Sequence, residues 1–107
     1  METRMEFYMT AGISADMDAD NHFAGAIGHI IHRFLMDDWG ILCKDDCQLN
    51  AEAKKSGGRI LGAYNTSKGR VYVITDDALA NPMVTTILYA DEYKGGHHEA
   101  GKAHHRI

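Results

Sequence analysis

The chain of 107 residues is long enough for one domain and too short for two separate cores, and its 45% hydrophobic and 24% charged residues are ordinary for a globular protein. Because it has no run of about 18 apolar residues and no basic segment followed by an apolar one at its N-terminus, we expect a cytoplasmic protein without a signal peptide or a membrane span. The net charge of −4 divides into −6 over residues 1–50 and +2 over residues 51–107. We interpret the acidic half either as an ordinary solvated surface or as a surface for a basic protein partner. We do not expect it to bind nucleic acid, because phosphates need cations.

The first predicted elements are a strand and a long helix. Loose alternation of apolar and aromatic residues in "MEFYMTAGIS" predicts a strand over residues 5–14, and the small and acidic residues of "ISADMDADN" are typical of a loop. Asp20 or Asn21 then begins a helix that ends near Met36. Its apolar residues recur at helical spacing: Phe23, Ile27, Ile30, Ile31, Phe34 and Leu35. On the opposite face lie His22, His29 and Arg33, which we expect to meet solvent because no HExxH pattern accompanies them.

The end of this helix carries an electrostatic conflict. In "MDDWG" (36–40), Asp37 and Asp38 follow the last turn, where the helix dipole disfavours each anion by about a few tenths of a kcal/mol. Gly40 is the expected left-handed residue after the helix, and Trp39 offers an apolar surface that folds back on the core. A cation, a helix N-terminus or a partner protein should compensate the aspartates. Our preferred candidate is Arg59, paired with Asp38 or Asp46.

A second helix is predicted to begin at Asp45 or Asp46, because Asp45 and Gln48 have the spacing of a capping box. It ends at the pair of glycines that follows two lysines. Cys43 and Cys47 lie one helical turn apart, a spacing that rarely allows a disulfide, and two thiols alone cannot complete a zinc site. We therefore expect two reduced, partly buried cysteines.

Three strands complete the predicted fold. "RILGAYNT" (59–66) and "RVYVITDD" (70–77) flank a connection of hairpin length, and "MVTTILYADEY" (83–93) is the third. Both alternation faces carry apolar residues, so helices should cover one face and something else, such as a second subunit, the other. Thr85 and Thr86 point to opposite faces, where each hydroxyl either pairs across strands or meets a ligand.

The predicted class is therefore α+β, in the order β-α-α-β-β-β, with two helices packed on a mostly antiparallel sheet. Residues 1–94 are assigned to a single domain. Residues 95–107, which carry four histidines and almost no apolar side chains, are assigned to a flexible His-rich C-terminal tail.

Motifs of catalysis and cofactor binding are absent from the sequence, which contains no GxxxxGK phosphate loop, no GxSxG and no HExxH. Several acids occur as adjacent pairs, but adjacent side chains diverge on a helix and alternate on a strand, so adjacency is not a catalytic dyad. We expect no enzymatic activity, no catalytic residue, no cofactor and no metal. A hydrolase built on carboxylates that converge in space is the remaining catalytic hypothesis.

Six segments occur in an order that is specific when they are taken together: "YMTAGI" (8–13), "DDWG" (37–40), "DCQLN" (46–50), "GGRILGAY" (57–64), "VYVITDD" (71–77) and "TTILYADEY" (85–93). In this order they resemble a family of small proteins from bacterial plasmids, integrative elements and phages. Some members carry the label of a type I restriction subunit, although this chain has no methyltransferase cofactor loop. The matching positions are Asp38, Trp39, Gly40, Asp46, Asn50, Gly58, Arg59, Ala63, Tyr64, Ile74, Thr75, Thr85, Thr86, Leu88, Glu92 and Tyr93.

The mobile-element setting of that family implies a role in the contest between such elements and bacterial defence. Small acidic proteins without catalytic motifs commonly act as anti-CRISPR or anti-restriction inhibitors by occupying basic nucleic-acid-binding surfaces. We therefore predict a protein that binds a CRISPR or restriction nuclease through Asp37, Asp38, Trp39, Asp45 and Asp46. The alternative is a small-ligand or nucleotide-binding module without catalysis that uses Arg59, Tyr64, Thr75, Thr85 and Thr86. Neither hypothesis involves a membrane, and a homodimer is left open.

Overall fold

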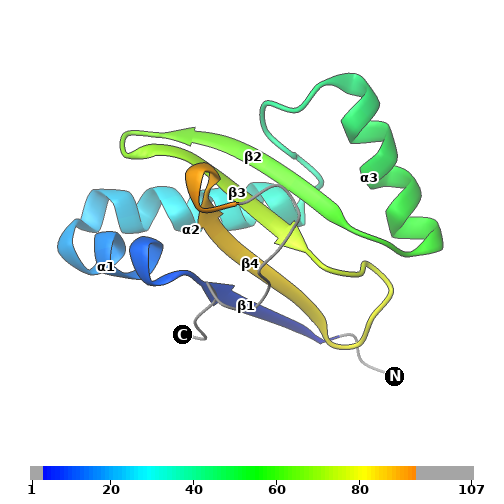
Figure 1. Ribbon diagram of the computed structural model, residues 1–107, viewed down its shortest axis with the longest axis horizontal. Helices are drawn as coiled ribbons and strands as arrows, with labels where there is room; N and C mark the ends of the chain where they lie inside the picture. The colour runs from blue at the N-terminus through cyan, green and yellow to red at the C-terminus, as the bar shows by residue number, and fades with distance from the viewer. Residues whose placement is uncertain (1–3, 94–107) are drawn as a thin grey trace.

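A four-stranded sheet organises the fold, in the strand order β1-β4-β3-β2. The computed structural model describes residues 4–93, so the predicted tail over 95–107 lies outside the described residues. The elements are β1 (Met5–Met9), α1 (Ala11–Ala19), α2 (Asn21–Leu35), α3 (Lys44–Ser56), β2 (Ile60–Thr66), β3 (Gly69–Thr75), β4 (Met83–Tyr89) and the short 3-10 helix η1 (Ala90–Glu92). The predicted α+β class and the order β-α-α-β-β-β are confirmed, with α1 as an additional helix (Figure 1). No helix within residues 4–93 has the length and apolar character that crossing a membrane requires.

The sheet is mostly antiparallel, as predicted. β2 and β3 form the expected hairpin, which runs from Ile60 opposite Thr75 to Thr66 opposite Gly69, and β4 is antiparallel to β3. β1 instead runs parallel to β4, so the first and the last strand of the chain are neighbours. The last strand ends at Tyr89, before the predicted boundary, because the chain turns into η1.

Helix α1 occupies residues that we had assigned to the end of the first strand and to a loop, so that prediction is wrong. Thr10 has extended backbone angles and its hydroxyl accepts a hydrogen bond from the Ile13 N–H, which ends β1 and caps α1. The helix has nine residues, buries only Ile13 completely and packs Met17 against the core. Such a short helix has little apolar periodicity, and for that reason its sequence resembles a loop. Asp20 caps α2 as predicted, because its carboxylate accepts two main-chain N–H groups of the first turn.

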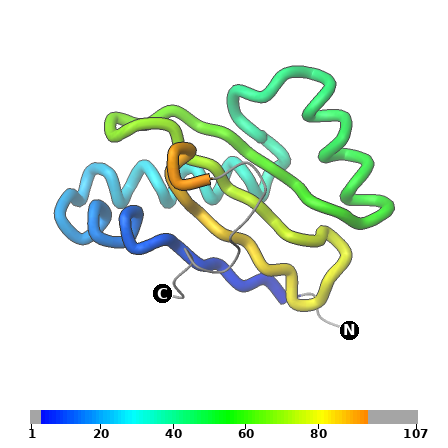
Figure 2. Tube along the Cα trace, in the orientation of Figure 1, coloured from blue at the N-terminus to red at the C-terminus, as the bar shows by residue number. Residues whose placement is uncertain are grey.

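Helices α1 and α2 cover one face of the sheet, and α3 lies beside the outer edge of β2 (Figures 1 and 2). The predicted apolar stripe of α2 supplies much of the core through Phe23, Ile27, Ile30 and Phe34. These side chains pack with the side chains of one sheet face: Ile60, Tyr64, Val71, Val73 and Ile87. Each fully buried side chain of this size contributes about 1.5–3 kcal/mol, so this layer carries most of the packing energy of the fold.

The opposite face of the sheet also carries apolar side chains, as predicted. Ile74 and Leu88 are buried there, and Tyr72 is half-buried with the ring of Tyr93 packed edge-on at 5.8 Å. Helix η1 lies on this side of the sheet, away from α2 (Figure 1). A second subunit on this face stays a prediction.

The start of α3 differs from the predicted capping box. Helix α3 begins at Lys44, its N-cap is Cys43, and no side chain caps it, so Asp45 and Gln48 do not form the box. Asp45 and Asp46 nevertheless lie in the first turn, where the helix dipole favours carboxylates.

Candidate functional site

The predicted contact residues lie around the connection between α2 and α3, which we call the α2–α3 corner and define as residues 35–49. Met36 is the C-cap of α2, and Asp37 follows it with a φ of 63°. Asp37 is therefore the left-handed residue after the helix, a place that we had expected Gly40 to take. Aspartate adopts this conformation more readily than most residues because its short polar side chain can bond locally.

Two cations compensate the aspartates at the end of α2. The Lys54 ammonium, in the last turn of α3, binds both oxygens of the Asp37 carboxylate, at 2.6 and 2.7 Å. The Arg33 guanidinium binds Asp38 in bidentate fashion, with Nε at 2.8 Å and Nη2 at 3.2 Å. This guanidinium, together with the Gly40 N–H, holds the pKa of the Asp38 carboxyl below its ordinary value.

Arg59 is not the compensating cation, so the hypothesis that it pairs with Asp38 or Asp46 is wrong. Its guanidinium donates a hydrogen bond to the Tyr93 hydroxyl. The physical reason is proximity, because Arg33 belongs to the last turn of α2 and lies only five residues before Asp38.

The segment after the aspartates forms main-chain hydrogen bonds with the outer edge of β2. The Ala63 N–H donates to the Trp39 carbonyl at 3.1 Å, and the Ile41 N–H donates to the Ala63 carbonyl at 2.9 Å. Gly40 lies between these two bonds with a φ of 79°, and a Cβ there would come within 1.9 Å of the Ala63 oxygen. Only glycine fits this approach, so "DWG" is first of all a structural segment.

Asn50 of α3 adds one more pair of hydrogen bonds to the same edge. Its side-chain amide accepts from the Leu61 N–H at 3.1 Å and donates to the Leu61 carbonyl at 2.8 Å. Nearby, the Tyr64 hydroxyl donates to the Asp38 carbonyl at 2.8 Å, and the Arg33 guanidinium lies 5.0 Å from the centre of the Tyr64 ring. Burial raises the pKa of the Tyr64 phenol, which therefore stays a hydrogen-bond donor.

The corner presents both apolar and acidic side chains to solvent. Within residues 4–93 five large apolar side chains are exposed: Leu35 (48%), Met36 (68%), Ile41 (47%), Leu49 (63%) and Leu79 (59%). All but Leu79 belong to the corner. Asp45 and Asp46 are exposed as well, and neither forms an ion pair with another described residue. Trp39, by contrast, is half-buried and packs against the core.

The residues of the alternative ligand site do not converge. Tyr64, Thr75 and Thr85 are buried on the face that the helices cover, and the Thr75 and Thr85 hydroxyls hydrogen-bond to each other at 2.7 Å. Thr86 alternates to the opposite face, and Arg59 precedes β2 at the surface. The cross-strand alternative is therefore confirmed for the Thr85 hydroxyl.

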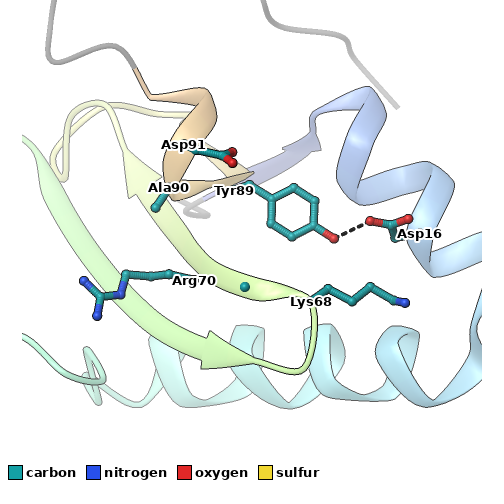
Figure 3. A pocket seen from close by; sticks show the side chains of 7 residues that line it. Asp16, Lys68, Arg70, Tyr89, Ala90 and Asp91 are labelled. Atoms are coloured by element: carbon teal, nitrogen blue, oxygen red, sulfur yellow. Dashed lines mark hydrogen bonds between the residues drawn. The ribbon is translucent and has the colours of Figure 1, made fainter.

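A pocket that the sequence analysis did not predict lies between α1, the β2–β3 hairpin and η1 (Figure 3). Its volume is about 390 Å³, and its lining consists of Asp16, Lys68, Gly69, Arg70, Tyr89, Ala90 and Asp91. The Tyr89 hydroxyl donates to the Asp16 carboxylate across the pocket, and burial together with this bond raises the pKa of the phenol. Cations and carboxylates border the same space, an arrangement that suits a small polar ligand. The sequence analysis missed the pocket because it assigned Asp16 to a loop.

Within residues 4–93, no three His, Cys, Asp or Glu side chains come together in a group that could hold a metal ion. Both cysteines are free; Cys47 is half-buried and its thiol donates to the Leu42 carbonyl at 4.0 Å. The prediction of partly buried thiols is confirmed for Cys47 and wrong for Cys43, which is exposed because it precedes the helix.

Comparisons of the chain with protein-family models, with curated proteins and with solved structures found no match. The resemblance to the mobile-element family therefore stays a prediction.

Proposed function

We propose that this protein is a mobile-element accessory protein that binds and inhibits a bacterial defence nuclease, of the CRISPR or restriction type, through the α2–α3 corner. The observation that carries the proposal is that four of the five large apolar side chains exposed within residues 4–93 occur at the corner. The same segment holds Asp45 and Asp46, which form no ion pair with another described residue. Protein interfaces combine apolar anchors with a charged rim that complements the partner.

The predicted contact residues take different parts in this proposal. Asp37 and Asp38 shape the corner, because Lys54 and Arg33 already neutralise them. Asp45 and Asp46 are available to cations of the partner, and the nucleic-acid groove of a nuclease supplies such cations. The charge of −6 over residues 1–50 adds long-range attraction toward a basic groove.

The test is direct inhibition with purified components. A panel of CRISPR effector complexes and restriction enzymes is incubated with the protein, and DNA cleavage and binding affinity are measured. For a nuclease that is inhibited, Asp45→Lys with Asp46→Lys should weaken binding at least about tenfold. The matched control is Asp18→Lys with Asp76→Lys, which changes two exposed acids outside the corner by the same charge.

A second pair of variants tests the apolar part of the corner. Met36→Ser should weaken binding, whereas Leu79→Ser, which removes a similarly exposed side chain elsewhere, should leave it unchanged. Absence of inhibition across the panel would remove the nuclease from the proposal. If the Asp45/Asp46 and the Asp18/Asp76 double variants reduced inhibition equally, the corner would be removed from the proposal.

The pocket favours a second candidate function, the binding of a small ligand such as a nucleotide without catalysis. Lys68 and Arg70 offer cations for a phosphate, although Lys68 is shared with Asp20 at 3.3 Å. A nucleotide that raises the melting temperature of the wild type but not of Arg70→Ala would support this candidate. No thermal shift with any nucleotide at millimolar concentration would dismiss it.

A further inference from the structure

The outer edge of β1 is an open hydrogen-bonding edge. The Met83 N–H donates to the Arg4 carbonyl and the Thr10 N–H donates to the Ile87 carbonyl, which fixes the alternation of the parallel β1–β4 ladder. Main-chain groups of even-numbered residues therefore face β4, and those of Met5, Phe7 and Met9 face away from the sheet. Among residues 4–93 nothing hydrogen-bonds to these three N–H and three C=O groups.

The two edges of the sheet differ in whether their outward main-chain groups have hydrogen-bond partners. The outward N–H and C=O groups of Leu61 bond to Asn50, and those of Ala63 bond to Trp39 and Ile41. β1 lacks the proline, the lysine and the bulge that commonly protect an edge, and Glu6 is the single charged side chain of "MEFYM". An edge strand with so few of these devices is a template for another strand.

We propose that two copies of this chain pair through β1, in antiparallel orientation about a two-fold axis at Phe7, and form one continuous eight-stranded sheet. In this register Phe7 lies opposite Phe7 of the second copy, and Met5 lies opposite Met9. All outward N–H and C=O groups of both copies are then paired, in three reciprocal pairs that make six hydrogen bonds. The strand is therefore self-complementary along its whole length.

The side chains favour the same register over its neighbours. Met5, Phe7 and Met9 share one face and continue the apolar layer across the axis, whereas Glu6 lies opposite Tyr8 of the second copy. A shift that centres the axis on Glu6 places two glutamates directly opposite each other and leaves Met9 unpaired. A shift that centres it on Tyr8 leaves Met5 unpaired.

This pairing goes beyond the proposed function and does not depend on it. β1 and β2 are opposite edges of the sheet, so a dimer through β1 leaves the α2–α3 corner of each copy accessible at the two ends of the long sheet. A dimer of this kind would present two corners to a multisubunit partner. Because the contact is a single pair of five-residue strands, the association is expected to be weak and to depend on concentration.

The experiment measures the association of the full chain by sedimentation velocity from about 1 μM to about 500 μM, a range suited to small interfaces. The informative variant is Met5→Pro, which removes an outward N–H without breaking the ladder to β4, and its matched control is Met5→Ala, which removes the same side chain but keeps the N–H. We expect the wild type and Met5→Ala to dimerise, and Met5→Pro to dimerise at least about tenfold more weakly, because two of the six hydrogen bonds are lost. Equal dimerisation of the two variants, or a wild type that stays monomeric throughout, would overturn the proposal.

Amide hydrogen exchange keeps the proposal testable if Met5→Pro fails to fold. In the wild type the amides of Met5, Phe7 and Met9 should gain protection as the concentration rises. The amides of Glu6 and Tyr8, which face β4, should be protected at every concentration. A dimer in which Met5, Phe7 and Met9 stay unprotected would place the interface elsewhere and refute the pairing.

Discussion

Replacement of Asn50 tests how the outer edge of β2 is held. Asn50 is 4% exposed, and its amide makes two hydrogen bonds to the main chain of Leu61. Each bond contributes about 0.5–1.5 kcal/mol net, and a buried group that loses its partner adds a desolvation penalty of about 1–3 kcal/mol. Because water reaches part of an edge, we expect Asn50→Ala to lower the free energy of unfolding by about 2–3 kcal/mol, a fall in Tm of about 10–20 °C for a domain of this size.

The variant Asn50→Asp distinguishes the two hydrogen bonds, because only one of them depends on pH. The introduced carboxylate still accepts from the Leu61 N–H, but it cannot donate to the Leu61 carbonyl, whereas the protonated carboxyl can do both. The folded state therefore favours the protonated form and raises the pKa of this carboxyl above its unfolded value of about 3.9. Its stabilising bond is fully present below about pH 4 and is lost as the pH rises through the folded pKa, so the variant should come closest to the wild type in acid.

The assay is urea unfolding followed by circular dichroism at pH 4 and at pH 7, with Gln48→Ala as a control at an exposed position of the same helix. Asn50→Ala within about 0.5 kcal/mol of the wild type would show that water satisfies Leu61 and would refute the role given to the amide. If the free energy of unfolding of Asn50→Asp differed from that of the wild type by the same amount at both pH values, the hydrogen bond from residue 50 to the Leu61 carbonyl would be refuted.

Three further sets of substitutions test other parts of the fold. Thr75→Val or Thr85→Val alone leaves one buried hydroxyl unpaired and should cost about 1–2 kcal/mol in urea unfolding, whereas the double variant should lie closer to the wild type; additive losses would contradict the hydroxyl pair. Gly40→Ala should lower the free energy of unfolding by more than about 3 kcal/mol, because a methyl group overlaps a main-chain oxygen of β2, and an unchanged Tm would disprove that approach. Arg33→Ala should lower Tm more than Arg59→Ala, and the reverse order would contradict the stabilising role given to the Arg33–Asp38 pair.

Elements with long and regular patterns could be predicted from the sequence. The apolar residues of α2 recur over four turns, and Asp20 provides a clear cap, so the predicted and observed bounds agree within about a residue. The β-branched and aromatic residues of β2 and β3 and the short polar connection between them specified the hairpin. Helix α1 could not be predicted in the same way, because a nine-residue helix against α2 needs only Ile13 and Met17 to face the core.

The candidate site was predicted only in part, because its contacts depend on how helices are placed in space. The sequence showed that Asp37 and Asp38 need cations, but it did not reveal that Lys54 comes within reach from the far end of α3. Likewise, the pocket requires Asp16 to meet Tyr89, and these residues belong to elements at opposite ends of the chain. Local sequence patterns do not predict such tertiary contacts until the topology of the sheet is known.

The parallel pairing of β1 with β4 has a consequence for the synthesis of the protein. Phe7 lies opposite Thr85, so β1 leaves the ribosome long before its partner strand has been translated. The β2–β3–β4 meander closes through short loops, but the β1–β4 contact must close almost the whole described chain, which is the slowest kind of contact to form. A nascent chain that has not yet reached β4 therefore carries an apolar first strand with no neighbour to pair with, and completion of the sheet has to wait for its last strand.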